Sequence, residues 1–520
     1  MSDQAISAAE PVRDDPFELR IAIVCVMLGM FMQMLDSTIA NVALPYMQGS
    51  LQASRDQITW VLTSYIIASA IMTAPVGWLA SRFGRKELFL ASLIGFTVAS
   101  MACGAAQSIE QMVMFRLLQG AFGATLSPLS QAIILDRYPL EKRASIMAIW
   151  SMVIMLGPIL GPTLGGFLTD NFSWRWVFYV NVPIGIVSVL GIMTFLREDR
   201  LPAPAKFDWF GFAALSAGIG GLQLMLDRGQ SQAWFNSPEV VLEGIVALLG
   251  LYLFVVHLMT SKTSFVPPEL LKDRNYRASL ILTFFVGMVL LATSALLPPY
   301  LQTLGGYSVL DTGLLMAPRG LGTMLTMLIV GRLAMRLDPR RIMLVGSLTL
   351  AWSMLEMSTW TPQIDMATLS WTSFIQGAGM GMIFVPSNLY GFSTLPQHLR
   401  TDGASAMNLL RNVGSAAGVS LTTTLLGVAV QTTYAQTSGH ASVFNRVLGV
   451  NADAMMLNPQ MPFGLAALHG MIMRNATITA YADTFLFMFW CSLPVVLIVL
   501  TLHKVVLMPP QPGQSVTIEE

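Results

Sequence analysis

The chain has 520 residues, of which 54% are hydrophobic and only 11% are charged, whereas a typical soluble protein carries about 25% charged residues. This composition excludes an ordinary soluble enzyme and predicts an all-α membrane protein. Lys plus Arg equals Asp plus Glu at 29 each, so the net charge gives no indication of a nucleic-acid partner. Cys25, Cys103 and Cys491 lie in apolar runs without a CxxC spacing, so neither a disulfide framework nor a zinc site is indicated.

Apolar stretches recur from the N-terminus to the C-terminus, each of about 20 residues and therefore long enough to cross about 30 Å of hydrocarbon. Residues 1–20 are polar and lack the pattern of a cleaved signal, so we expect a cytoplasmic N-terminal segment. Six spans are predicted within 21–196, two inserted spans within 207–259, and six more within 279–504. The expected spans are 21–45, 57–79, 88–106, 111–135, 145–168, 176–196, 207–226, 239–259, 279–301, 311–333, 341–360, 367–391, 402–430 and 482–504.

The distribution of basic residues supports this topology. With the N-terminus in the cytoplasm, 21 Lys and Arg residues fall in cytoplasmic segments, five in outer loops and three within spans. An excess of basic residues is typical of cytoplasmic loops. Fourteen spans therefore place both termini in the cytoplasm, a long outer loop at 431–480 and a cytoplasmic tail at 505–520.

Internal repeats indicate two related halves. GWLASRFGRK from Gly77 is matched by GRLAMRLDPR from Gly331, and QGAFGA from Gln119 is matched by QGAGMG from Gln376. The offsets, including that of a third pair near Arg143, lie between 254 and 260 residues. Two six-helix bundles in parallel orientation, separated by two inserted helices, explain this spacing.

Few ionisable residues fall within the spans, and each is a functional candidate because a charge inside a membrane is costly. Asp36 lies on a stripe of small and polar residues in the first span, and Arg116 lies on a similar stripe in the fourth. The two are predicted to pair, either as a static ion pair that locks helices or as a carboxylate that releases its partner when it takes up a proton. Glu356 is the comparable carboxylate of the second half, with Arg319 and Arg411 as alternative partners.

The fifth span contains GPILGPTLGG, which places glycines on one close-packing face and adds two prolines. We expect this run to take part in conformational change. Its residues are Gly157, Pro158, Gly161, Pro162 and Gly165.

A substrate cavity lined by aromatic, amide and methionine side chains is expected between the halves. The candidates for substrate binding are Gln33, Asn41, Trp60, Tyr65, Gln119, Tyr300, Phe384 and Asn388. No GxxxxGK[ST] motif occurs, which argues against ATP hydrolysis and favours an ion gradient as the energy source. We expect no metal and no cofactor, and paired acid and base groups that would indicate an integral-membrane enzyme do not cluster.

Several motifs together resemble the major facilitator superfamily, and within it the fourteen-helix drug:proton antiporters of the EmrB and QacA type, closer to EmrB. They are LDSTIANVALP, GWLASRFGRK, RLLQGAFGA, GPILGPTLGG and WRWVFYVNVPIG, and the resemblance covers nearly the whole chain. The resemblance implies a major facilitator fold and proton-coupled export of drugs or other amphipathic molecules from the bacterial inner membrane. A transporter of one specific metabolite or lipid on the same fold is the alternative, because fold does not fix substrate.

The resemblance also assigns roles to residues. It implies that Asp36 and Arg116 couple transport to protons and that the glycine and proline run serves antiport. We expect an ionised Asp36 to be held by Arg116 and to attract a cationic or polar substrate. The loop motif after the second span matches the family at Gly77, Arg82, Gly84, Arg85 and Lys86 but has Ser81 where the family usually has an acid. The long outer loop resembles the EmrB branch, which implies a periplasmic adaptor (membrane fusion protein) and an outer-membrane channel as partners.

Overall fold

A computed structural model gives the arrangement of the chain and describes residues 16–197, 207–229, 231–261, 267–334, 337–396, 399–438 and 462–502. Within these residues the regular structure is entirely helical. The expected N-terminal segment 1–20 is described only from residue 16, and the expected tail 505–520 lies outside the described residues.

The first half contains helices α1 to α9, and the inserted segment contains α10 and α11. Their bounds are α1 Pro16–Ser50, α2 Arg55–Thr73, α3 Val76–Phe83, α4 Arg85–Ala105, α5 Ile109–Gly123, α6 Leu126–Arg137, α7 Leu140–Asn171, α8 Trp176–Tyr179, α9 Asn181–Phe195, α10 Trp209–Arg228 and α11 Pro238–Thr260. The second half contains α12 Arg274–Pro299, η3 Tyr300–Leu304, α13 Val309–Leu333, α14 Pro339–Ser358, α15 Met366–Ser393, α16 Arg400–Ser438 and α18 Pro462–Thr501. Short 3-10 turns lie at η1 Trp234–Asn236 and η2 Pro268–Leu271.

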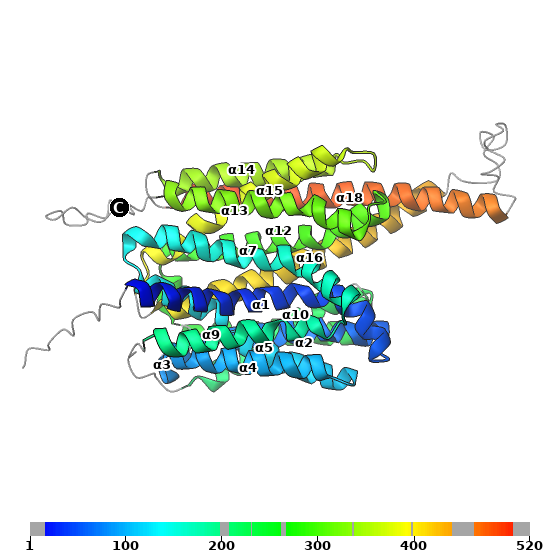
Figure 1. Cartoon of the computed structure of the whole chain (residues 1–520). Coiled ribbons are helices and arrows are strands. Elements are labelled where there is room, and N and C mark those ends of the chain that lie inside the picture. The colour runs from blue at the N-terminus through cyan, green and yellow to red at the C-terminus, as the bar shows by residue number, and fades with distance from the viewer. Residues whose placement is uncertain are drawn as a thin grey trace, which may run out of the picture.

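The long helices run side by side, so the bundle has two ends (Figure 1). We call the end at which α1 begins and α18 finishes the terminal face, and the opposite end the distal face. Several helices start on side chains that accept a hydrogen bond from a backbone N–H of the first turn. Ser54 and Gln57 form a capping box on α2, while Asp273 caps α12 and Asp365 caps α15.

The same helix pairings occur in both halves. In the first half α1 packs on α7, α2 on α5 and α4 on α9. In the second half α12 packs on α16, α13 on α15 and α14 on α18. These are the pairings that a sequence repeat of six spans predicts.

The inserted helices α10 and α11 pack on each other and contact both halves. α10 packs on α2 of the first half and on α16 of the second. Near the distal face, Trp234 donates a hydrogen bond to Thr424 of α16 at 3.2 Å. The inserted pair therefore lies beside the boundary between the halves.

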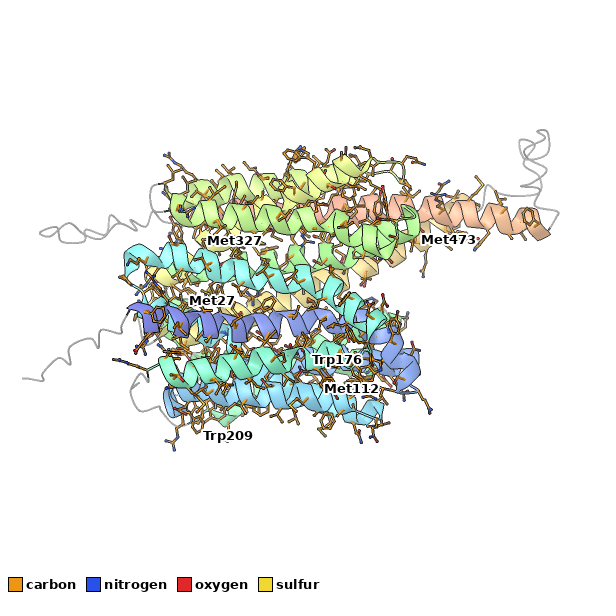
Figure 2. All side chains as sticks on the ribbon, in the orientation of Figure 1. Met27, Met112, Trp176, Trp209, Met327 and Met473 are labelled. Atoms are coloured by element: carbon orange, nitrogen blue, oxygen red, sulfur yellow. The ribbon has the colours of Figure 1, made fainter. Side chains whose placement is uncertain are left out.

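Apolar side chains on the outside of the bundle fit a lipid environment. Among the described residues, nine helices are long and apolar enough to cross a membrane, or ten if the bent pair α2 and α3 is one span. The segments α5–α6, α7, α14 and α15 pack among these helices without passing the same test, so the count of fourteen stays a prediction. Exposed Trp176 and Trp209 lie at the distal and terminal ends respectively (Figure 2), as expected for an aromatic belt.

Three predicted spans are broken rather than continuous. The span expected at 57–79 is α2 and α3, which meet at an angle of 61°. Pro75 precedes α3 and cannot donate a backbone hydrogen bond, which explains the bend. The spans expected at 111–135 and 176–196 are likewise divided, into α5 with α6 and α8 with α9.

The segment expected as an outer loop at 431–480 is largely helical in the described residues. α16 continues to Ser438, α18 begins at Pro462, and residues 439–461 lie outside the described part. The two helices extend past the others on the distal side (Figure 1) and pack together, with Tyr434 hydrogen-bonded to His469 at 2.7 Å. We call this extension, residues 431–438 and 462–480, the distal hairpin.

Candidate functional site

A buried ion pair connects α1 to α5. The Asp36 Oδ2 atom accepts a hydrogen bond from Arg116 Nη1 at 2.7 Å, and both side chains are completely buried. Arg116 also donates from Nε to the backbone oxygen of Val61 at 3.0 Å and from Nη1 to Gln119 at 2.8 Å. The predicted pairing of Asp36 with Arg116 is thus present in the structure.

Two side-chain amides also donate hydrogen bonds to the carboxylate. Asp36 Oδ1 accepts hydrogen bonds from Gln119 Nε2 and from Asn181 Nδ2, each at 2.8 Å. Asn181 also donates to Ser100 at 2.9 Å, so α9 and α4 join the network. Sequence reasoning missed Asn181 and Ser100, although the polar Asn181 within the apolar run of WRWVFYVNVPIG was a signal.

The guanidinium of Arg116 is enclosed by aromatic rings as well as by hydrogen bonds. It lies 4.2 Å from the centroid of the Tyr65 ring and 5.7 Å from that of Phe178. Within the described residues, Arg116 Nη2, Gln33 Oε1, Tyr65 Oη and Asn181 Oδ1 are buried and make no hydrogen bond. Buried polar atoms left unpaired are costly and are typical of functional sites. The Asp36 carboxylate is completely buried in this conformation, and its expected attraction for a substrate stays a prediction.

The glycine run of α7 packs directly on the part of α1 that carries Asp36. A Cβ atom at position 157 would lie 2.6 Å from the backbone of Met34, and one at position 161 would lie 2.2 Å from Thr38 Oγ1. Thr38 donates a hydrogen bond to the backbone oxygen of Gly157 at 3.1 Å. Gly165 continues this close contact against Ile39, and the helix runs without interruption through positions 158 and 162. A movement of α7 relative to α1 would therefore displace residues of α1 that lie within one helical turn of Asp36.

A second polar cluster joins the two halves at the terminal face. Asp136 of α6 accepts hydrogen bonds from Arg85 of the first half and from Arg400 of the second, the latter at 2.6 Å. Arg85 Nε also donates to Thr401 at 3.1 Å. We call Arg85, Asp136, Arg400 and Thr401 the terminal-face lock. Its acid and its partners on α16 were not among the predicted residues, because nothing in a single sequence pairs positions so far apart.

Two further hydrogen bonds cross between the halves in the layer above this lock. Ser127 of α6 donates to Asn408 of α16 at 2.9 Å, and Gln131 of α6 donates to Asn388 of α15 at 2.8 Å. Asn408 lies near the start of α16 and Asn388 near the end of α15, which are the ends of these helices at the terminal face. The halves are therefore joined on the terminal side.

Each residue of the loop motif between the second and third spans makes different contacts. Arg85 is buried in the lock, Lys86 donates to the backbone of Met193 at 3.2 Å, and Arg82 is exposed. Gly84 separates α3 from α4 with a φ of 86°, a left-handed conformation that favours glycine. Ser81 donates to the backbone of Trp78 at 2.8 Å.

The residues predicted to bind substrate do not form one site. Asn41 and Trp60 are exposed, and the centroid of the Trp60 ring lies 5.9 Å from the Arg228 guanidinium. Tyr300 lies in an aromatic cluster of the second half with Trp360, Tyr481 and Phe485. Gln33, Tyr65 and Gln119 lie at the ion pair, whereas Phe384 and Asn388 lie at the boundary between the halves.

Glu356 does not pair with either arginine proposed for it. It is partly buried near the distal end of α14, and no ion pair of the described residues involves it. Arg319 instead donates to Ser294 at 3.1 Å and to the backbone of Leu290, while Arg411 donates to Asn408 at 2.6 Å. Among the described residues no group of His, Cys, Asp and Glu could hold a metal ion.

Comparison with known proteins identifies the class. Residues 26–419 match the profile of the Major Facilitator Superfamily. The fold is shared with the proton:xylose symporter XylE, at a TM-score of 0.57 and 14% identity over 92% of this chain and 96% of the other. It is also shared with the human organic anion transporter MFSD10, at a TM-score of 0.58 and 16% identity over 92% of this chain and all of the other. The chain belongs to the major facilitator superfamily.

Curated relatives place the chain more narrowly. The multidrug export protein EmrB of Escherichia coli K12 is 37% identical over 443 residues, which are 84% of this chain and 85% of that protein. The fatty acid resistance protein FarB of Neisseria gonorrhoeae is 37% identical over 399 residues, 76% of this chain and 79% of that one. Within the superfamily the chain belongs to the EmrB family of multidrug export proteins, so the predicted fold and family are confirmed.

Proposed function

We propose that this protein exports drugs or other amphipathic molecules across the bacterial inner membrane in exchange for protons. The observation that carries the proposal is the completely buried Asp36–Arg116 pair, held by Gln119 and Asn181 and adjoining the glycine contact between α1 and α7. A titratable carboxylate buried in a bundle, with a guanidinium that its protonation would release, is suited to proton coupling.

The terminal face is the cytoplasmic face in this proposal, in keeping with the excess of Lys and Arg in the loops on that side. The structure is then closed toward the cytoplasm by the terminal-face lock and by the bonds from Ser127 and Gln131. A proton arriving from outside protonates Asp36 and weakens its hold on Arg116. The halves then separate at the cytoplasmic face, where the proton leaves and substrate enters.

The energy available suits export against moderate gradients. One proton that moves down a membrane potential of 100 mV releases about 2.3 kcal/mol. That free energy supports about a fiftyfold concentration gradient of a neutral solute. No cofactor is required in this scheme.

The distal hairpin supports an adaptor as partner. On the proposed topology it projects into the periplasm, and its start on α18 exposes Phe463 and Leu465, at 74% and 55% of their full surface. Exposed apolar side chains beyond the bundle indicate a contact surface. A periplasmic adaptor that continues to an outer-membrane channel would cover them.

The second candidate is a transporter dedicated to one lipid or metabolite. FarB, named for fatty acid resistance, is as similar in identity as EmrB, which favours keeping this alternative. The two differ in breadth of substrate, and transport assays with a chemically varied set of molecules separate them.

The test is transport by purified protein in vesicles with an imposed pH gradient. We expect accumulation of a fluorescent drug to require the gradient, and Asp36→Asn to lose gradient-driven accumulation because the amide cannot take up the proton. Glu87→Gln, which removes an exposed carboxylate of the same half, is the matched control and should transport normally. Gradient-driven transport by Asp36→Asn at the rate of the unmodified protein would overturn the coupling role.

A further inference from the structure

Arg411 is a partly buried cation without a carboxylate partner among the described residues. It lies on α16 about 16 Å along the helix from Arg400, and so near the middle of a membrane about 30 Å thick. Its Nη2 atom donates to Asn408 Oδ1 at 2.6 Å, and no ion pair of the described residues involves it. By contrast, Arg116 has Asp36 and the arginines of the terminal-face lock have Asp136.

The surroundings of Arg411 differ from those of Arg319, which also lies within a predicted span of the second half and forms no ion pair among the described residues. Arg319 is satisfied inside its own half by Ser294 and by the backbone of Leu290. Arg411 instead contacts Asn408, whose Oδ1 atom also accepts the hydrogen bond from Ser127 of the first half. Arg411 therefore adjoins the boundary that must open and close during transport.

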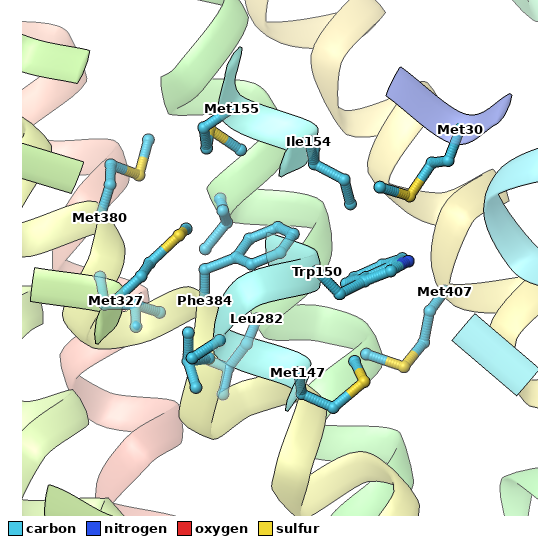
Figure 3. Packing of buried hydrophobic residues seen from close by; sticks show 14 of the residues in the cluster. Met30, Met147, Trp150, Ile154, Met155, Leu282, Met327, Met380, Phe384 and Met407 are labelled. Carbon is cyan, nitrogen blue, oxygen red and sulfur yellow. The ribbon is translucent and has the colours of Figure 1, made fainter. Parts of the chain in front are cut away.

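A buried apolar cluster rich in methionine lies one helical turn away. Met407 precedes Arg411 by four residues and so shares its face of α16. Figure 3 shows Met407 near Trp150 and Met147 of α7, with Phe384 of α15 on the other side of Trp150. Both halves contribute to this buried cluster, which also contains Met30, Met155, Met327 and Met380. Methionine side chains adapt to ligands of different shape.

We propose that Arg411 binds the anionic group of an amphipathic substrate, such as a carboxylate, while the apolar part of that substrate packs on the methionine cluster. A guanidinium at this depth is costly to leave without a counter-charge, so a bound anion is stabilised there. The inference rests on the proposed export function and names the class of substrate for it.

The proposal has an electrical consequence. If one substrate anion leaves for each proton that enters, two elementary charges cross the membrane in each cycle. Export of a neutral molecule in exchange for one proton moves one charge. A membrane potential that is negative inside should therefore accelerate anion export more steeply than export of a neutral analogue.

The experiment compares two fluorescent probes with the same apolar body, a dansyl-labelled long-chain carboxylate and its methyl ester, in vesicles containing the full chain. Arg411→Gln should lower kcat/KM for the carboxylate by about tenfold or more, mainly through KM, and leave the ester within about twofold, because only the carboxylate loses a charge-assisted hydrogen bond. Arg411→Lys should retain most carboxylate transport. Arg319→Gln is the matched control and should affect both probes equally.

Each outcome decides the matter. An equal loss for both probes in Arg411→Gln, or no loss for either, would overturn the role of Arg411. If that variant does not fold, the potential dependence of the unmodified protein decides instead, and equal steepness for the two probes would contradict the proposal. Transport of the ester but not of the carboxylate by the unmodified protein would reject this inference alone, whereas transport of neither probe nor of any drug would reject the proposed export function.

Discussion

Asp402 of α16 lies against Gly77 of α3 so closely that a Cβ atom at position 77 would lie 1.4 Å from its carboxylate oxygen. The two residues belong to different halves and meet beside the terminal-face lock. Ser81, where the resemblance to the family leads us to expect an acid, is one turn farther along α3. Asp402 lies in the first turn of α16, where a negative charge is favourable. A carboxylate is therefore present beside this loop motif, but it comes from the opposite half.

Gly77→Ala should weaken closure at the terminal face. The added methyl group must displace the Asp402 carboxylate. The new Cβ atom would also lie 3.2 Å from the Asp402 Cα atom, so α3 and α16 must move apart. We expect the equilibrium constant between the states closed and open at this face to shift roughly tenfold toward the open state, which corresponds to about 1.4 kcal/mol. Labelling of a single cysteine introduced near the lock measures the shift.

The control for this change is Gly313→Ala, because a Cβ atom there meets nothing within 4 Å. In that variant the introduced cysteine should be labelled to the same extent as in the unmodified protein, and transport should be equally fast. Identical labelling of Gly77→Ala and Gly313→Ala would show that the contact with Asp402 does not hold the face closed.

Ser81→Asp should also favour opening at the terminal face. Positions 77 and 81 share one face of α3, so the new carboxylate would face the region that Asp402 occupies, and like charges repel. Ser81→Asn has nearly the same shape without the charge and is the matched control. Cysteine labelling from both sides of the membrane should change for the aspartate variant and not for the asparagine variant, and unchanged profiles for both would mean that the position is neutral.

Gly157→Ala should impair transport without preventing insertion. A Cβ atom at this position would lie 2.6 Å from the Met34 backbone, which cannot rotate away as a side chain can. α1 and α7 must then separate, close to the Asp36 network, so we expect loss of export or a proton leak in vesicles. Gly166→Ala on the same helix meets only Val42 at 4.0 Å and should behave normally. Equal activity of the two variants would make the glycine run ordinary packing.

The features that repeat along the chain were predictable from the sequence. Apolar length, basic loops and the repeats near Gly77 and Gln119 predicted the superfamily fold, and residue depth predicted that Asp36 would pair with Arg116. These signals are local or periodic, so one sequence contains them.

Contacts between distant segments were not predictable. The partner of Arg85 is Asp136, and its second contact is Thr401 in the other half. Glu356 was expected to pair with an arginine, but Arg319 donates to Ser294 and Arg411 donates to Asn408 instead. Which face of a helix meets which neighbour depends on tertiary packing. The same limit explains why the residues predicted to bind substrate divide between the ion pair, the boundary between the halves and the aromatic cluster of Tyr300.

The distal hairpin leads to the last prediction, which concerns the adaptor. Because much of the expected loop is helix that packs against itself, replacing 431–480 with a flexible linker would also remove parts of α16 and α18. A milder change is Phe463→Glu together with Leu465→Glu, which alters exposed side chains at the far end of the hairpin. If these side chains anchor an adaptor, charges there should weaken its binding by about tenfold or more.

Transport in vesicles needs only the bundle, whereas resistance of cells with an outer membrane also needs transfer of substrate to the adaptor. The double variant should therefore transport normally in vesicles and confer less resistance in such cells. Met366→Glu, which places a charge at another exposed apolar position of the distal face, should change neither result. Loss of vesicle transport in the double variant would assign the hairpin to the transport cycle itself, and full resistance in cells would contradict an adaptor contact at this surface.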